Sequence, residues 1–201
     1  MKVTIYVEGG GDSKYQHIQC RRGFRKLIEK SGLAGKMPSI FACGGRNAAF
    51  DDFKTAMNSK SPTDYPMLLV DSEDPIAENI TPWNHLRTRD GWVPPNAIFD
   101  EQAQLMVTCM ETWIMADHAT LRNVFGADLQ ENALLPETNL EQYDRYRIQQ
   151  ALEHATRNCK NKAYKKGKRS FQVLEAVNPS ALKQRLSYFR RFIETLENHL
   201  R

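Results

Sequence analysis

Short apolar runs alternate with helix-periodic segments over the first 126 residues, and no other feature of the sequence limits the fold as strongly. Each run is rich in β-branched, aromatic or aliphatic residues and stops near a glycine or an acid, which predicts short strands buried on both faces. The predicted strands are residues 2–7, 39–43, 67–71 and 105–109, and the predicted helices are residues 13–31, 47–57 and 110–126. Strands that alternate with helices form a parallel sheet with right-handed crossovers. The pattern therefore predicts an α/β fold with a small, mainly parallel four-stranded sheet flanked by helices.

Beyond Gly126 the sequence becomes more polar and keeps a helical pattern, with a closing helix predicted from about residue 179 to residue 199. Residues 75–100, rich in Pro, Trp and Gly, are predicted to form a loop. We expect an α/β core in residues 1–126 and a helical C-terminal cap in residues 127–201. The cap is expected to pack on the core as part of one compact unit.

The composition is that of an ordinary soluble globular protein, with 41% hydrophobic and 26% charged residues, which disfavours disordered and fibrous classes. Its four cysteines form no C-x-x-C pair, so neither a zinc knuckle nor a disulfide framework is predicted. The first apolar run is too short for a signal peptide, and no stretch approaches membrane-spanning length. We therefore expect a cytoplasmic protein with no membrane partner.

Acidic residues follow two of the predicted strands, and a further acid follows the fourth. Glu8 comes after the first strand, Asp71 and Glu73 come at the end of the third, and Glu111 follows the last. The carboxyl ends of parallel strands share one edge of the sheet, so these side chains should converge there together with Gly44. Clustered carboxylates repel unless a cation neutralises them, and hard oxygen ligands suit Mg²⁺ or Mn²⁺. Taken singly, Glu8 could instead cap the next helix or pair with an arginine, and Asp71 could be a turn acid.

The glycines after Glu8 do not form a known nucleotide-binding loop. The stretch "GGGDSK" lacks the final Gly-Lys-Ser/Thr of a Walker loop and the last glycine of a dinucleotide fingerprint. Gly9 and Gly10 are instead predicted to let the backbone approach a ligand beside Glu8. Arg46, after Gly44 and Gly45, is predicted either to bind phosphate or to brace Asp51 or Asp52.

A basic segment at residues 157–169 holds seven Lys or Arg residues and no acid. Such a segment is typical of polyanion binding, although a solvated basic loop has the same composition. The residues expected to contact phosphate or nucleic acid are Gly9, Gly10, Arg46, Lys162, Lys165, Lys166, Lys168 and Arg169.

The tryptophans divide into two groups. Trp113 lies in an apolar helical pattern and is predicted to be a core residue. Trp83 and Trp92 lie in the predicted loop and are interpreted either as a packed lid over the site or as a partner surface. The histidines show no metal-ligand spacing and receive no role.

Several motifs resemble the toprim fold of topoisomerases, primases and overcoming-lysogenization-defect nucleases. They are "VEGGGD", "ACGGRNAAFDDF", "LLVDSED", "PWNHLRTRDGW", "LMVTCMETWIMAD" and "KGKRSF". Together they resemble more closely an uncharacterised bacterial toprim-like family associated with neighbouring ATPase genes and phage defence. The resemblance extends over nearly the whole chain and implies a toprim-like Rossmannoid core.

The resemblance also implies roles for individual residues. Glu8 matches the toprim glutamate, and Asp71 with Glu73 matches the paired acids, although the common form has Asp in the second place. A later acid and a lysine complete the site in overcoming-lysogenization-defect nucleases. Glu111 is the matching acid here, as a fourth ligand or a general base, and the catalytic lysine would be Lys165, Lys166 or Lys168.

Three functional hypotheses follow. The first is a Mg²⁺- or Mn²⁺-dependent nuclease that hydrolyses DNA or RNA as an effector of a bacterial defence system. The second is an interaction or regulatory subunit of an ATPase complex with little activity alone. The third is a phosphatase for a small phosphorylated metabolite, which would not depend on the basic segment. Homo-oligomerisation is compatible with each of them.

Overall fold

Four parallel strands form a single sheet in a computed structural model that describes residues 1–96, 98–167 and 169–200. The strands are β1 (Lys2–Val7), β2 (Ser39–Ala42), β3 (Asp64–Asp71) and β4 (Ala103–Met106), in the spatial order β2-β1-β3-β4. In the register of the central strands, Val7 of β1 lies beside Ala42 of β2 and Leu69 of β3. The predicted α/β class, with a four-stranded parallel sheet flanked by helices, is confirmed.

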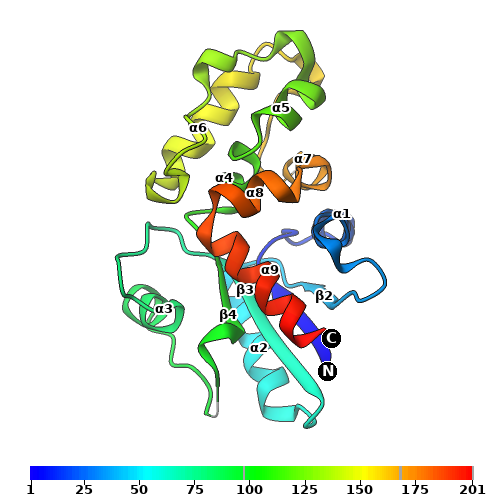
Figure 1. Cartoon of the computed structure of the whole chain (residues 1–201), viewed down its shortest axis with the longest axis vertical. Helices are drawn as coiled ribbons and strands as arrows, with labels where there is room; N and C mark the ends of the chain where they lie inside the picture. The colour runs from blue at the N-terminus through cyan, green and yellow to red at the C-terminus, as the bar shows by residue number, and fades with distance from the viewer. Residues whose placement is uncertain (97, 168, 201) are drawn as a thin grey trace.

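Helices surround this sheet and extend beyond it (Figure 1). The α-helices are α1 (Lys14–Ile28), α2 (Arg46–Ser59), α3 (Pro82–Asp90), α4 (Met110–Met115), α5 (His118–Phe125), α6 (Arg145–Thr156), α7 (Ser170–Ala176), α8 (Pro179–Arg185) and α9 (Ser187–His199). Short π or 3-10 turns are η1 (Glu29–Leu33), η2 (Asp100–Gln102), η3 (Gly126–Asp128), η4 (Glu131–Ala133), η5 (Leu140–Gln142) and η6 (Lys160–Lys162). Helices α5 and α6 lie at the end of the molecule opposite the two chain termini.

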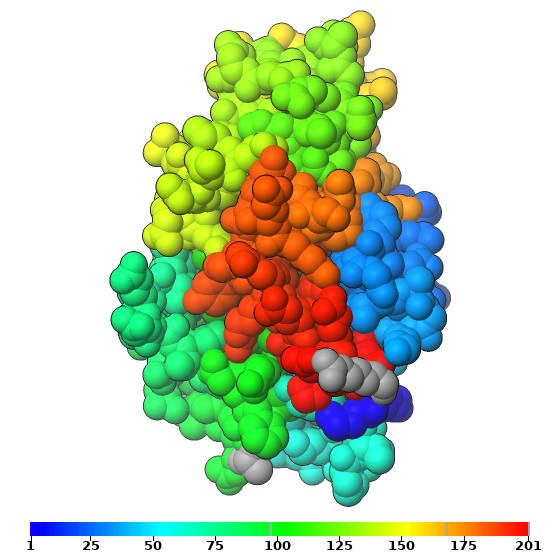
Figure 2. Space-filling view, viewed as in Figure 1, coloured from blue at the N-terminus to red at the C-terminus, as the bar shows by residue number. Residues whose placement is uncertain are grey.

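Alternate residues of the strands face two separate hydrophobic clusters. On β3, Met67 and Leu69 face the cluster that contains α1 and α9, whereas Leu68 and Val70 face the cluster that contains α2 and α3. Side chains of a strand point alternately to opposite faces, so a sheet covered on both sides needs the near-continuous apolar run that β3 has. In the space-filling view α8 and α9, orange to red, cover the centre of the face shown (Figure 2).

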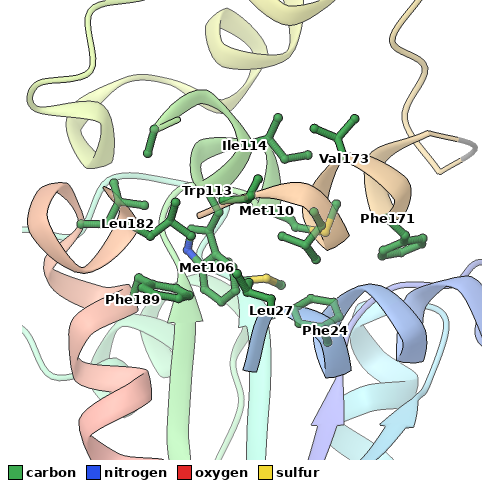
Figure 3. Close-up of a cluster of buried hydrophobic side chains, with 14 of the residues drawn as sticks. Phe24, Leu27, Met106, Met110, Trp113, Ile114, Phe171, Val173, Leu182 and Phe189 are labelled. Carbon is green, nitrogen blue, oxygen red and sulfur yellow. The ribbon is translucent and has the colours of Figure 1, made fainter. Parts of the chain in front are cut away.

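Trp113 of α4 joins the sheet to the C-terminal helices. Its fully buried ring lies 6.1 Å from the ring of Phe24 on α1 and 4.9 Å from that of Phe189 on α9, measured between centroids. Figure 3 shows it among Met106, Leu182 and Phe189. The cluster runs from Val3 to Leu196, so residues on both sides of position 126 share one core. Trp113 is a core residue, as predicted.

Two predicted helices are each broken into two. Asp117 separates α4 from α5 because its carboxylate accepts hydrogen bonds from the N–H of Thr120 (3.0 Å) and of Asn178 (2.8 Å), which caps α5 and fixes the chain direction. The fully buried Leu186 separates α8 from α9 in an extended conformation. The predicted loop at residues 75–100 also contains a helix, α3, which Thr81 caps.

The interpretation of Trp83 and Trp92 as an exposed partner surface was wrong, whereas their alternative interpretation as a packed lid is compatible with the burial of both rings and the contact of Trp92 with Arg46. Both side chains are buried under the α2 face of the sheet, where Trp92 stacks on Phe50 with centroids 4.3 Å apart and Trp83 packs on Phe53. The local Pro- and Gly-rich sequence suggested an exposed loop, but the ring contacts with α2 are long-range and leave no local pattern.

Among the described helices, none combines the length and the apolar character needed to cross a bilayer.

Replacing Trp113 by alanine should lower the free energy of unfolding by about 3–5 kcal/mol, because it removes the ring that α1, α4 and α9 share. Urea denaturation followed by circular dichroism measures the change. Phe99→Ala is the matched control, since Phe99 is 65% exposed and its loss should change stability by less than about 0.5 kcal/mol. Equal stabilities for the two variants would contradict this account of the core.

Candidate metal centre

Three carboxylates meet at the carboxyl ends of the two central strands. Glu8 follows β1, Asp71 ends β3, and Glu73 lies two residues further on. One oxygen from each lies within 4.8 Å of the others. The strands are joined at this point, because the Asp71 N–H donates to Oε2 of Glu8 (3.1 Å) and the Glu8 N–H donates to the Leu69 carbonyl (2.9 Å). The predicted convergence of these acids is what the structure shows.

Glu73 reaches the cluster through an unusual backbone conformation. Its φ is 70°, in the left-handed region that few residues other than glycine adopt. The Glu73 N–H donates to the Thr108 carbonyl beyond β4 (2.8 Å), which holds the turn in place. Backbone conformations of this kind cost free energy and are concentrated at functional sites.

Arg46, at the start of α2, connects the acid cluster to α3. Its guanidinium donates two hydrogen bonds to Asp90 (3.0 and 2.7 Å), one to Oε2 of Glu8 (3.3 Å) and one to the carbonyl of Asp71. It also lies 4.9 Å from the centre of the Trp92 ring. Arg46 therefore braces Glu8 and Asp90.

The alternative partners predicted for Arg46 are engaged elsewhere. Asp51 pairs with Lys54 (2.8 Å) on the surface of α2, and Asp52 lies beside the Cys43 thiol. The expectation that Arg46 braces one of these two acids was wrong, because the side chain turns toward the strand ends.

Two further arginines contact Glu73. Arg89 of α3 donates to Oε2 of Glu73 (3.3 Å), and Arg145, the first residue of α6, forms an ion pair with the same oxygen. Arg89 also pairs with Asp74 (3.1 Å) and Asp90 (2.7 Å). Both arginines were absent from the sequence-based site. "RTRD" at residues 87–90 was the available signal, but its relation to the acids depends on α3 folding back over the strand ends.

The arginines do not neutralise every acid. Burial raises the pKa of the Glu8 carboxyl despite the opposing charge of Arg46. Burial raises the pKa of Asp71 well above its ordinary value, the charges of Glu8 and Glu111 add to the rise, and Lys166 opposes it. At both carboxyls the cost of burial therefore outweighs the nearby positive charges.

Asp90 shows the opposite balance. Burial would raise its pKa, but the hydrogen bonds and charges of Arg46 and Arg89 lower it below the ordinary value. In a purely structural ion-pair network, the pKa of every acid would be lowered by its cationic partners as that of Asp90 is. The arginines therefore offset the effect of burial at Asp90 but not at Glu8 or Asp71.

The donor set fits a hard divalent cation. Among the described residues no hydrogen-bond donor contacts Oε1 of Glu8, Oδ2 of Asp71 or Oε1 of Glu73, while the second oxygen of each acid is held by a protein donor. Asp71, for example, accepts the Met110 N–H through Oδ1 (2.8 Å). Oriented carboxylates with free oxygens and no His or Cys ligand suit Mg²⁺ or Mn²⁺. The cluster can therefore hold a metal ion.

Glu111 lies next to the acid cluster but outside the group of three. Its fully buried carboxylate accepts a hydrogen bond from the hydroxyl of Tyr164 (2.8 Å), and the amide of Gln149 lies 3.5 Å away. Tyr164 is held in turn by its N–H, which donates to the hydroxyl of Thr156 (2.9 Å). Glu111 thus ties the start of α4 to the segment that carries the candidate lysines.

A cavity of about 260 Å³ opens beside the carboxylates. Glycines form much of its wall, and Lys166, Ser170 and Phe171 line another part. Gly9 and Gly44 are joined by two backbone hydrogen bonds (2.8 and 3.0 Å), and a Cβ added at Gly44 would lie 2.8 Å from the Gly11 carbonyl oxygen. Only glycine permits this close approach of backbone segments.

The candidate basic residues occupy different positions. Lys166 lines the cavity and is close enough to influence Glu8 and Asp71. Lys162 and Lys165 are exposed and are not among the residues that line it, and Arg169 donates to the Asn161 carbonyl (2.7 Å). Lys168 lies outside the described residues.

Comparison with known proteins gives one family. A family model described as "Domain of unknown function (DUF4276)" matches residues 7–197. Neither the curated proteins nor the solved structures show a significant match to the chain.

Replacing Asp71 by asparagine should stabilise the metal-free protein at about pH 8. The pKa of Asp71 is raised in the folded protein, whereas in the unfolded chain it is about 3.9. Between these two values the folded state holds the proton more tightly, so the free energy of unfolding falls as the pH rises through this range. Asparagine keeps the acceptor for the Met110 N–H and cannot ionise. Thermal denaturation in a chelator should show a higher Tm, by about 2–4 °C for each kcal/mol, and no gain at or below about pH 4.

The exposed Asp12 supplies the control, since Asp12→Asn should leave the Tm unchanged across this range. A Tm of the Asp71→Asn variant at or below that of the wild type at about pH 8 would show that Asp71 is fully neutralised by its protein neighbours.

Proposed function

We propose that this chain, which belongs to the DUF4276 family, is a Mg²⁺- or Mn²⁺-dependent phosphodiesterase that acts on nucleic acid. One observation carries the proposal: three carboxylates with free oxygens meet at the strand ends, and two of them, Glu8 and Asp71, line a glycine-walled cavity that Lys166 also lines. Hydrolysis of a phosphodiester requires both features. A cation binds the phosphate oxygens, and a cavity wall without side chains lets the phosphate come close to the cation.

The residues proposed to hold the metal are Glu8, Asp71 and Glu73. A bound divalent ion would polarise the phosphoryl group. It would also lower the pKa of a bound water molecule, so that hydroxide is available for attack near neutral pH. Arg46 and the Asp71 N–H fix Oε2 of Glu8, and the Met110 N–H fixes Oδ1 of Asp71. These donors orient the free oxygens before any ligand arrives, which reduces the entropy cost of assembling the site.

Lys166 is proposed to neutralise charge on the phosphate during its transfer. A flexible ammonium at the cavity wall can follow the phosphate oxygens as negative charge develops on them. Tyr164 lies two residues before Lys166, and its hydroxyl is bonded to Glu111. This contact anchors the segment and limits the positions that the lysine can take. The same hydrogen bond leaves Glu111 better suited to positioning than to direct metal ligation.

The relation to toprim nucleases is part of the proposal. The Glu-Gly turn after β1 and the Asp-x-Glu pair after β3 support it, since both lie at the ends of neighbouring parallel strands. A role as a defence effector beside an ATPase rests on the resemblance of the sequence motifs. The competing role as a pure ATPase-binding subunit keeps the helical cap as a docking surface but loses the two tryptophans, because Trp83 and Trp92 are buried.

Replacing Glu8 by glutamine should lower Mn²⁺ affinity by at least about 100-fold and abolish metal-dependent cleavage of DNA or RNA. The change keeps the side-chain size and removes one ligand charge. Calorimetric titration of Mn²⁺ and a cleavage assay with labelled DNA and RNA measure the two effects, and Asp12→Asn is again the control. Unchanged affinity in the Glu8→Gln variant would overturn the metal assignment, and cleavage by that variant at the wild-type rate would overturn the proposed function.

Lys165 and Lys166 form a matched pair, since they are adjacent but only Lys166 lines the cavity. Lys166→Ala should slow cleavage about 100-fold or more at saturating substrate, whereas Lys165→Ala should mainly weaken substrate binding at low salt. Rates measured over a range of substrate concentrations separate the two effects. Equal losses in turnover would show that the lysines act only through general charge, and hydrolysis of a small phosphomonoester in preference to nucleic acid would favour the phosphatase hypothesis.

A further inference from the structure

A cluster of arginine and tyrosine side chains, which we call the α6 patch, lies at the N-terminal end of α6 beside the acid cluster. It consists of Tyr143, Arg145, Tyr146 and Arg147. The guanidinium of Arg145 lies 4.7 Å from the centre of the Tyr146 ring, and that of Arg147 lies 4.8 Å from the centre of the Tyr143 ring. Nothing in the proposed hydrolytic chemistry requires these aromatic rings.

Tyr146 presents a large aromatic surface to solvent. Its side chain is 58% exposed although Arg145 covers part of the ring and donates a hydrogen bond to the hydroxyl (2.8 Å). An exposed ring held by an arginine is a suitable surface for a nucleobase, because every base has a π face and can stack on it without sequence preference. The neighbouring guanidinium groups can neutralise phosphates of the same strand.

The α6 patch is held in place by three interactions. Asp144 caps α6 by accepting hydrogen bonds from the N–H of Tyr146 (2.8 Å) and of Arg147 (3.3 Å). The Tyr143 carbonyl accepts a hydrogen bond from the hydroxyl of Thr108 (3.0 Å), next to β4. A surface that is already ordered loses little entropy when a ligand binds, so these contacts favour a binding role.

Arg145 connects the patch to the candidate metal centre. The same side chain contacts the ring of Tyr146 and forms an ion pair with Glu73. A base stacked on Tyr146 would therefore place the adjoining phosphates of its strand next to the acid cluster. The interior base pairs of a duplex are covered on both faces by their neighbours, so along a strand the ring favours an unpaired base.

We propose that the α6 patch is a stacking site for an unpaired nucleobase, and that the substrate is single-stranded nucleic acid or an unpaired segment within a larger one. This inference rests on the proposed function and specifies its substrate class. It assigns Tyr146 to substrate binding and gives it no part in the chemical step.

Fluorescence anisotropy with a labelled oligothymidylate of about 12 nucleotides tests the site in a chelator, where no cleavage occurs. We expect Tyr146→Ala to weaken binding by about 5- to 150-fold, Tyr146→Phe to bind like the wild type, and a duplex of the same length to bind the wild type more weakly than the single strand. Phe99→Ala is the control, because Phe99 is an aromatic residue of similar exposure. It lies just before η2 and β4, at the amino end of that strand, away from the acid cluster at the carboxyl ends.

Three results would overturn the stacking site: binding unchanged by Tyr146→Ala, equal binding of duplex and single strand, or binding of polyglutamate as tight as that of the oligonucleotide. The last result would assign the α6 patch to an acidic protein partner. A failure of the proposed function would appear separately, as an absence of metal-dependent cleavage in a protein whose oligonucleotide binding still depends on Tyr146.

Discussion

The hydrogen bond from the Asp71 N–H to the Glu8 carboxylate is the contact on which the site depends. It joins the ends of β1 and β3, and it brings two acids together that would otherwise repel each other. Parallel pairing makes this possible, because both strands finish at the same edge of the sheet. The other parts of the site lie around this pair of strand ends. They are the arginines of α2, α3 and α6 and the glycines that line the cavity.

The charges around this pair are compensated only in part. Arg46 and Arg89 lower the pKa of Asp90, yet the pKa values of the half-buried Glu8 and the buried Asp71 stay raised. A protein that needed these acids only for stability would gain by replacing them with neutral residues, since unneutralised buried carboxylates cost free energy. A cation bound between them would remove this cost, and the three acids are close enough together to hold one.

The strands and the convergence of Glu8, Asp71 and Glu73 could be predicted from the sequence, because apolar period and strand-end position are local properties of the chain. The ion pairs of Arg89 and Arg145 could not, since they depend on where α3 and α6 lie after folding. The break between α4 and α5 does have a local signal, because Asp117 and Thr120 have the spacing of a helix cap. The buried positions of Trp83 and Trp92 required the contacts with α2, which no local pattern reveals.

The position of α9 has a consequence for the synthesis of this protein. Phe189 and Phe192 of α9 pack on Trp113, so the main core cannot close around that ring until α9 has left the ribosome. At translation rates of about 5–20 residues per second, the strands that carry Glu8 and Asp71 wait several seconds for the helix that covers them. The carboxylates and the segment that holds Lys166 therefore come together late in synthesis.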